Sequence, residues 1–233
     1  MPTIILGDCP GGVGNHKDTQ IYSAAVNASY GDDARMSMRL FGGFINTTVC
    51  RWDLTLLPAN ATIVSAIASF FKQDVAGVPS IQNLSFHNLL TDFGVTRINE
   101  GVAQNPPVGA NDAATWTNPF AVTGTNWAGG GVFSAADYTA LAFALQNTNV
   151  GDAVDKEYQV DFLPAVNLWF NNDATNNGFI IRRTDNVNNF VFWHTREAVN
   201  PLVRPCLTIQ YTVPSTGTTR QSHTAIHNGI AIM

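Results

Sequence analysis

The residues of this chain that could do chemistry are few, and each group lacks a part that the chemistry needs. The glycine-rich stretch Gly7–Gly14 follows the apolar run Thr3–Leu6, an order that nucleotide-binding loops share. However, Asn15 and His16 stand where a phosphate-binding loop needs lysine and then serine or threonine, and Lys17 replaces the third glycine of a dinucleotide fingerprint. We therefore interpret this stretch as part of an arm rather than as a nucleotide site.

Candidate metal ligands are also incomplete. Asp173–Gly178 matches the first half of a calcium-binding loop, but Thr184 occupies the position of the last carboxylate ligand, which favours a simple turn. His223 and His227 are one helical turn apart in a tail with few helix signals. Four further carboxylates cluster in sequence and are interpreted as solvated: Asp152, Asp155, Glu157 and Asp161. We expect no metal and no cofactor.

Two tryptophans are the candidate ligand-binding residues. Trp116 and Trp127 lie in polar, glycine-rich surroundings, where an aromatic ring could stack on a sugar. The alternative is that they anchor their loops by packing, as most tryptophans do. No serine-hydrolase elbow, zinc-protease motif or placed acid–base pair is present, so we do not expect an enzyme.

Five charged residues are interpreted as structural. Charged residues make up only 12% of the 233 residues, so those beside predicted core strands are expected to form ion pairs or to cap strand ends. These residues are Asp53, Arg182, Arg196, Glu197 and Arg204.

Composition restricts the partners and the compartment. The net charge is −5 without any basic run, so nucleic acid is not an expected partner, and no apolar run is long enough to span a membrane. The first residues do not resemble a secretory signal, which predicts synthesis in a cytoplasm. The cysteines Cys9, Cys50 and Cys206 are scattered and odd in number, and are interpreted as buried thiols.

The elements that position these residues are predominantly strands. Thr47–Leu56 alternates, with Cys50, Trp52 and Leu54 facing inward, whereas Ile63–Phe71 is apolar on both faces and indicates a central strand. Pro164–Phe170 has helical spacing after a proline. Ser134–Leu145 fits either a helix or a turn followed by a strand, and we favour the second. Four further apolar runs predict strands: Val160–Leu163, Phe179–Ile181, Phe190–Trp193 and Leu207–Tyr211.

A series of short motifs in one order resembles the DNRLRE-domain family. The first is Arg51–Ala66, which reads RWDLTLLPANATIVSA, and Ala114–Trp116 and Asn176–Arg182 follow it. The last are Thr195–Glu197 and Arg204–Tyr211, so that the similarity covers roughly residues 18–213. The resemblance implies a non-catalytic, jelly-roll-like antiparallel β-sandwich, of a kind that binds acidic polysaccharides or forms parts of surface and phage proteins.

From these features we expect a β-sandwich module over residues 18–213, an N-terminal arm at 1–17 and a C-terminal tail at 214–233. The apolar residues of both ends, such as Ile4 and Ile230, need partners, so we expect the arms to contact another copy or other virion proteins. The alternative is that the arms fold back on their own sandwich. The expected function is a structural component of a phage virion, assembled in the host cytoplasm. The other function kept open is an extracellular or cell-surface module that binds polysaccharide.

Overall fold

The computed structural model describes residues 1–13, 16–24, 30, 33–77, 81–91, 114, 127–128, 133–149, 151–185 and 189–214. These residues contain one α-helix, α1 (Leu163–Asn171), and two short 3-10 turns, Asp173–Thr175 and Pro201–Val203. The strands are β1 (Thr3–Leu6), β2 (His16–Tyr22), β3 (Arg35–Phe41), β4 (Phe44–Trp52), β5 (Thr62–Gly77), β6 (Ile81–Asn88), β7 (Ala144–Asn149), β8 (Glu157–Asp161), β9 (Phe179–Arg183), β10 (Asn189–His194) and β11 (Cys206–Thr212).

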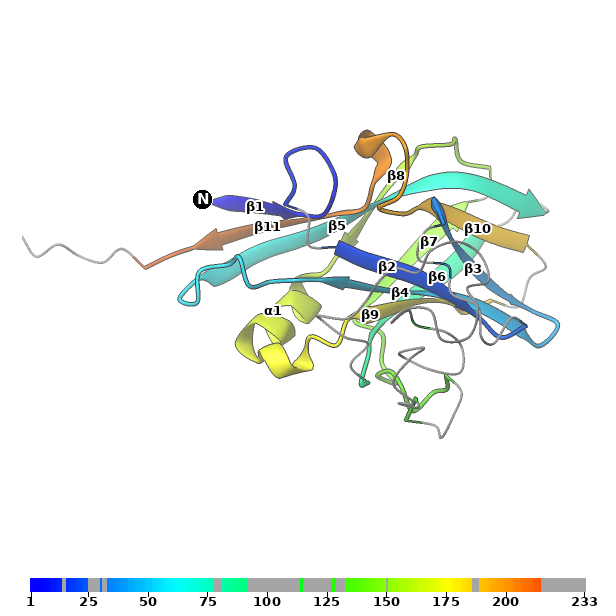
Figure 1. Ribbon diagram of the computed structural model, residues 1–233, viewed down its shortest axis with the longest axis horizontal. Helices are drawn as coiled ribbons and strands as arrows, with labels where there is room; N and C mark the ends of the chain where they lie inside the picture. The colour runs from blue at the N-terminus through cyan, green and yellow to red at the C-terminus, as the bar shows by residue number, and fades with distance from the viewer. Residues whose placement is uncertain are drawn as a thin grey trace, which may run out of the picture.

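All the strand pairs are antiparallel, and the sheet curls over one core as an all-β, sandwich-like fold (Figure 1). The long strand β5 is the centre of this arrangement. Its first part pairs with β11 on one side and with β8 on the other, and its second part pairs with β10. β10 then pairs with β3, which leads into the opposite layer of β2, β4, β9, β6 and β7. The predicted β-sandwich and its central strand at Ile63–Phe71 are confirmed.

Aromatic side chains fill the space between the two layers. Trp52, Phe70, Phe86 and Phe179 are fully buried, and their rings contact one another in stacked or tilted pairs at centroid distances such as 5.1 Å for Trp52 and Phe179. Such pairs contribute about 0.5–1.5 kcal/mol each beyond the area that they bury. Trp193 lies stacked on Phe70 at 4.8 Å, which joins β10 to this core.

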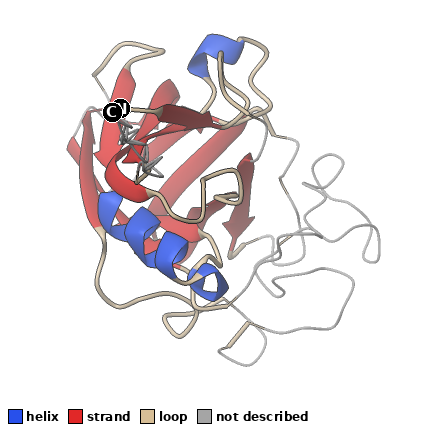
Figure 2. Ribbon diagram, turned by 90° about the vertical axis from the view of Figure 1, so that its left-hand side faces the viewer, coloured by secondary structure: helices blue, strands red, loops and turns tan. Residues whose placement is uncertain are grey.

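The predicted helix is present as α1. Pro164 lies in its first turn, where a missing N–H costs nothing, and Ala165, Val166 and Trp169 form the buried face. The Asp161 carboxylate accepts a hydrogen bond from the Leu163 N–H at 2.9 Å, which fixes the entry to the helix. The helix runs beside the strands and covers one end of the core (Figure 2).

Strand β4 differs from the prediction that it is half-buried. Cys50, Trp52 and Leu54 face the core as expected, but Val49 and Arg51 are buried as well. The reason is a second apolar cluster on the other face, in which Val49 packs with Ile21, Ile180, Trp127 and other residues. A local alternation of residue types does not reveal that the outer face of a strand is covered by a distant segment.

The Ser134–Leu145 region contains the favoured turn, but the strand begins later than predicted, at Ala144. Asp137 determines the turn. Its carboxylate accepts hydrogen bonds from the backbone N–H groups of Ser134, at 2.8 Å, and Ala128, at 2.6 Å. Directly after this turn the Thr139 N–H donates to the Asn88 carbonyl at 2.9 Å, but the regular ladder with β6 begins only at Ala144.

The N-terminal segment is not an arm, and the prediction that residues 1–17 lie outside the sandwich is wrong. β1 pairs with β11 along its whole length, Leu6 lies in the main core, and His16 and Lys17 belong to β2. The backbone groups and apolar side chains of Thr3–Leu6 thus find partners within the chain, as the fold-back alternative requires. The C-terminal tail from residue 215 lies outside the described residues.

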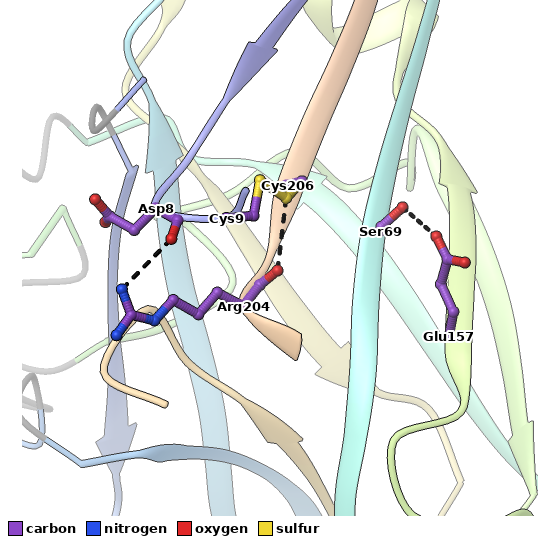
Figure 3. The surroundings of a disulfide bond; sticks show 6 residues. All are labelled: Asp8, Cys9, Ser69, Glu157, Arg204 and Cys206. Atoms are coloured by element: carbon purple, nitrogen blue, oxygen red, sulfur yellow. Dashed lines mark hydrogen bonds between the residues drawn. A yellow bond between two sulfur atoms is a disulfide. The ribbon is translucent and has the colours of Figure 1, made fainter. Parts of the chain in front are cut away.

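Cys9 and Cys206 form a disulfide between the loop after β1 and the first residue of β11 (Figure 3). The interpretation of all three cysteines as free thiols is therefore wrong, and it holds only for Cys50, which is buried. Gly7 permits the arrangement, because it has φ +128° and a Cβ there would lie 2.6 Å from the Pro205 carbonyl oxygen.

Candidate functional site

Trp127 does not form a surface platform. Only 1% of it is exposed, and its ring packs edge-on against Phe133 at 5.0 Å in the second apolar cluster. Its assignment as a ligand-binding residue is therefore wrong, and the alternative of loop packing describes it. Trp116 lies outside the described residues.

Two of the five structural charges act locally. The Asp53 carboxylate directly follows β4 and accepts a hydrogen bond from the Thr55 N–H at 2.8 Å, which caps the end of that strand. The Arg182 guanidinium lies over the ring of Tyr138 at 4.5 Å, where a cation is attracted to the electron-rich face. The first contact shapes the turn after β4, and the second holds the segment of Tyr138 onto β9.

The other three charges converge on the N-terminal segment. The Arg196 Nε atom lies 3.2 Å from an Asp8 carboxylate oxygen and 3.1 Å from one of Glu197. Arg204 donates to the Ala198 carbonyl at 2.8 Å. It also donates to the Asp8 carbonyl at 3.4 Å (Figure 3). Together with the disulfide, these contacts tie the loop after β1 to the segment between β10 and β11, and we call this group the terminal clasp.

A histidine is buried directly beneath the terminal clasp. His16 stacks on Trp52 at 5.0 Å and is fully buried, and Arg196 donates to its carbonyl oxygen at 2.7 Å. Burial lowers the pKa of His16 to about 3, and the positive charges of Arg196 and Lys17 add to the effect. The Asp18 carboxylate, 3.5 Å from Nδ1, would favour the charged ring. That carboxylate accepts the backbone N–H of Arg196 at 3.0 Å, and the effect of burial is larger, so the neutral imidazole prevails.

The glycine-rich loop serves the clasp. The Gly7 N–H donates to the Val13 carbonyl at 2.8 Å, and the Gly12 N–H donates to the Cys9 carbonyl at 2.9 Å. These backbone donors are therefore used within the loop rather than turned toward a phosphate. The glycines bring Cys9 to Cys206, a role that becomes visible only once β1 is known to pair with β11.

The other candidate ligand groups do not assemble into a centre. In the described part of the chain no three metal-ligating side chains lie together. Asp173–Thr175 forms a 3-10 turn, and Asp152 accepts hydrogen bonds from Lys156 at 2.8 Å and Tyr158 at 2.6 Å. Those two donors lower the pKa of Asp152. His223 and His227 lie outside the described residues.

The surface also has a cleft that sequence reasoning missed. It lies between the β4–β5 loop and α1, has a volume of about 300 Å³, and is lined by Leu54, Thr55, Leu57, Ala59, Trp169, Phe170 and Asp173. Most of the side chains that line it are apolar, and its polar side chains are the Asp173 carboxylate and the Thr55 hydroxyl. The residue types of the two segments gave no signal of their proximity, because the cleft forms only when α1 packs beside the loop after β4.

Comparisons with known proteins do not extend this description. No family model matches the chain, and no curated protein matches it. The resemblance to the DNRLRE-domain family therefore stays a prediction. None of the described helices is both long and apolar enough to cross a membrane.

Proposed function

We propose that this protein is a non-enzymatic structural component of a larger particle, a phage virion protein such as a capsid decoration, head fibre or tail appendage. The observation that carries the proposal is an exposed apolar edge at β6 and β7. Leu145 on β7 is 74% exposed and Ile81 on β6 is 62% exposed. Both side chains lie on the outer face, because Leu145 pairs with Ser85 and Ile81 is four residues from Ser85 on the same strand.

The position of β7 adds to this apolar surface. Within the described residues β7 pairs as a strand only with β6, so its other side has no neighbouring strand, although the Asn149 N–H at its end donates to the Tyr158 hydroxyl at 3.4 Å. Leu141, in the segment that enters β7, is 86% exposed. A neighbouring subunit on this edge would bury apolar area at about 25 cal/mol per Å² and would also pair backbone groups. We call this surface the β7 edge.

The disulfide agrees with a protein that functions on the surface of a virion. Disulfides persist in secreted proteins and on virion or cell surfaces, and are rare in a reducing cytosol. Cys9 and Cys206 join β1 to β11 covalently, which suits a protein that must last outside the cell in which it was made. This observation favours the virion and the extracellular alternative equally.

The proposal is tested by the mass of the pure protein in solution. We expect light scattering to show an oligomer or a concentration-dependent association, which Leu145→Lys abolishes because a charge at the β7 edge opposes burial. Val199→Lys is the matched control, since Val199 is 94% exposed in a loop between β10 and β11. A wild-type protein that stays monomeric at every concentration, or a Val199→Lys variant that dissociates as fully, contradicts the role of the β7 edge.

The second function is that of a carbohydrate-binding module. The burial of Trp127 removes one of the residues on which this alternative depended. The cleft beside α1 now favours it, because small-molecule sites are concave and mostly apolar with a few polar groups. The two functions are compatible, since a virion appendage can also hold a host glycan.

A further inference from the structure

We infer that the cleft between the β4–β5 loop and α1 is the docking site of the chain's own C-terminal tail, residues 215–233. In this arrangement the Ile226 side chain enters the cleft, and the Arg220 guanidinium pairs with the Asp173 carboxylate. The inference rests on neither of the functions proposed above. It competes with the second one, because a docked tail occupies the space that a sugar would need.

The two segments that form the cleft expose apolar groups. Leucines of the β4–β5 loop and aromatic rings of α1 line the cleft, which has a volume of about 300 Å³. In the same two segments Leu56 is 49% exposed and Leu168 is 45% exposed. Removing apolar area of this kind from water is favourable, so a further apolar segment on this surface would be stabilised.

The tail begins beside this cleft. Thr212, at the end of β11, pairs with Thr62, the first residue of β5. Ala59, which lines the cleft, lies three residues before Thr62. The end of β11 and α1 lie at the same end of the molecule (Figure 1). The fourteen residues from Thr212 to Ile226 can span up to about 46 Å, so the length of the tail does not prevent it from reaching the cleft.

The charge of the cleft complements that of the tail. Among the described residues that line the cleft, Asp173 is the only charged one, and its side chain makes no hydrogen bond or ion pair with another described residue. The tail contains Arg220, His223 and His227 and no Asp or Glu, although the whole chain has a net charge of −5. An arginine suits a carboxylate beside an apolar wall, because its aliphatic stem packs on the wall while the guanidinium donates to the oxygens.

The apolar part of the cleft requires an aliphatic side chain. Ile226 is the first one after Arg220, six residues further along the tail. Six residues span at most about 20 Å, a length that lets the two side chains reach opposite parts of the cleft together. The exposed Thr55 hydroxyl can bond to the backbone of the tail between them, because a hydroxyl both donates and accepts.

Proximity favours the chain's own tail over the tail of a second copy. A segment tethered next to its binding site has an effective concentration on the order of 1 mM. A second copy must supply that concentration in solution, and two chains that each have a net charge of −5 repel each other. The N-terminal segment behaves in the same way, since β1 pairs with β11 of its own chain.

The experiment is a disulfide cross-link in the full-length protein. Ala59→Cys and Ile226→Cys place one thiol on the wall of the cleft and one on the tail, and mild oxidation joins them if they meet. We expect both new thiols to be lost within the monomer, as measured by thiol counting and non-reducing gels. Val199→Cys, at a position that is 94% exposed between β10 and β11, replaces Ala59→Cys in the control pair. The control pair should cross-link at least about tenfold more slowly.

Further substitutions in the Ala59→Cys/Ile226→Cys protein test the ion pair. Arg220→Gln and Asp173→Asn should each slow the cross-link about threefold, the strength of an exposed ion pair. The two together should slow it no further, because either change alone removes the pair. Asp74→Asn, at an exposed carboxylate toward the other end of β5, is the matched control and should change nothing.

A second measurement needs no added thiols. Trypsin cleaves after arginine, and a docked tail shields Arg220 from the protease. Ile226→Asp should therefore accelerate the cleavage after Arg220 about tenfold, because a charged side chain does not enter an apolar cleft. The rate for the wild type should not depend on protein concentration, since the tail docks within one chain.

The outcomes separate the occupant from the site. A cross-linked dimer, or cleavage that slows as protein concentration rises, would overturn docking within one chain and assign the cleft to the tail of a second copy. Equal cross-linking of the two thiol pairs, or an unchanged cleavage rate in Ile226→Asp, would overturn the cleft as the docking site. A cross-link that neither Arg220→Gln nor Asp173→Asn slows would overturn the ion pair.

Discussion

At the scale of single residues, His16 is a titratable side chain that is fully buried. Its pKa is lowered from 6.5 to about 3 by burial, with Arg196 and Lys17 adding to the effect. The folded protein therefore keeps the ring neutral where the unfolded chain binds a proton. The contribution of the neutral His16 to the free energy of unfolding is fully present above pH 6.5. It falls by up to about 5 kcal/mol as the pH drops from 6.5 toward 3.

The prediction is tested by urea unfolding between pH 7 and pH 4. His16→Phe keeps the stacking on Trp52 but cannot titrate, so the free energy of unfolding should depend less on pH in this variant than in the wild type. His87→Gln is the comparison, because burial also lowers the pKa of His87 but its ring nitrogens have the partners Thr139 and Ser85. Equal pH dependence in wild type and His16→Phe would refute the buried neutral histidine.

Asp137 is the second residue on which a region depends. Although buried, its carboxylate accepts hydrogen bonds from Ala128, Ser134 and Thr91, so it joins three loop segments beside Tyr138. We expect Asp137→Ala to lower the free energy of unfolding by roughly 3 kcal/mol, because several donors lose their charged acceptor together. Asp173→Ala, at a carboxylate with no hydrogen bond to a described residue, should cost less than about 0.5 kcal/mol. Thermal unfolding measures the stability of both variants. Equal losses of stability would argue against the hydrogen bonds of Asp137 as the contacts that hold this region together.

Residue types alone predicted part of this picture. Asp53 follows a strand pattern directly, so its capping role could be proposed from its position in the sequence. Trp127 could not be assigned in the same way, because its glycine-rich neighbours suggest exposure while Phe133 and Leu89 bury it through tertiary contacts. The cleft was missed for the same reason, since Thr55 and Asp173 meet only in the folded chain.

At the scale of elements, β1 is an integral strand rather than an appendage. Leu6 is fully buried, and its strand pairs with β11 from Thr3 onward. Leu6→Ala should therefore destabilise the protein by about 2–5 kcal/mol through lost burial and a cavity. Val13→Ala, in the same segment but 39% exposed, should cost less than about 1 kcal/mol. Chemical denaturation of both variants measures these losses. An unchanged midpoint for Leu6→Ala would show that residues 1–17 form an arm and do not belong to the sandwich.

Elements with strong local patterns were predicted well. α1 and β8 to β11 lie where proline, β-branched and aromatic residues indicated them, with ends that differ by a few residues. β7 was placed too early, because Thr139 and Phe143 bond to β6 only at separate points and the regular ladder begins at Ala144. The pairing of β1 with β11 joins opposite ends of the chain, and no local pattern carries that information.

At the scale of the whole molecule, the disulfide links two segments near opposite ends of the chain. Cys9 and Cys206 are 197 residues apart, so the bond restricts most of the unfolded chain. We expect the double variant Cys9→Ser/Cys206→Ser to lose about 2–5 kcal/mol of stability. A reductant should lower the Tm of the wild type to that of the variant and leave the variant unchanged.

Thiol counting provides the independent check. The unreduced wild type, when denatured, should expose one reactive thiol of its three cysteines, that of Cys50. Three reactive thiols, together with a Tm that does not respond to reductant, would contradict the terminal clasp as described here. That outcome would also remove the support that the disulfide lends to a location outside a reducing cytosol.

The central claim, that the protein is a structural part of a particle, is tested most directly by quantitative mass spectrometry of particles purified from cells that make it. The account predicts a fixed number of copies per particle that stays constant through a density gradient, and a loss of incorporation in Leu145→Lys but not in Val199→Lys. Recovery of the wild-type protein only in free form, with none in the particle fractions, would contradict the claim.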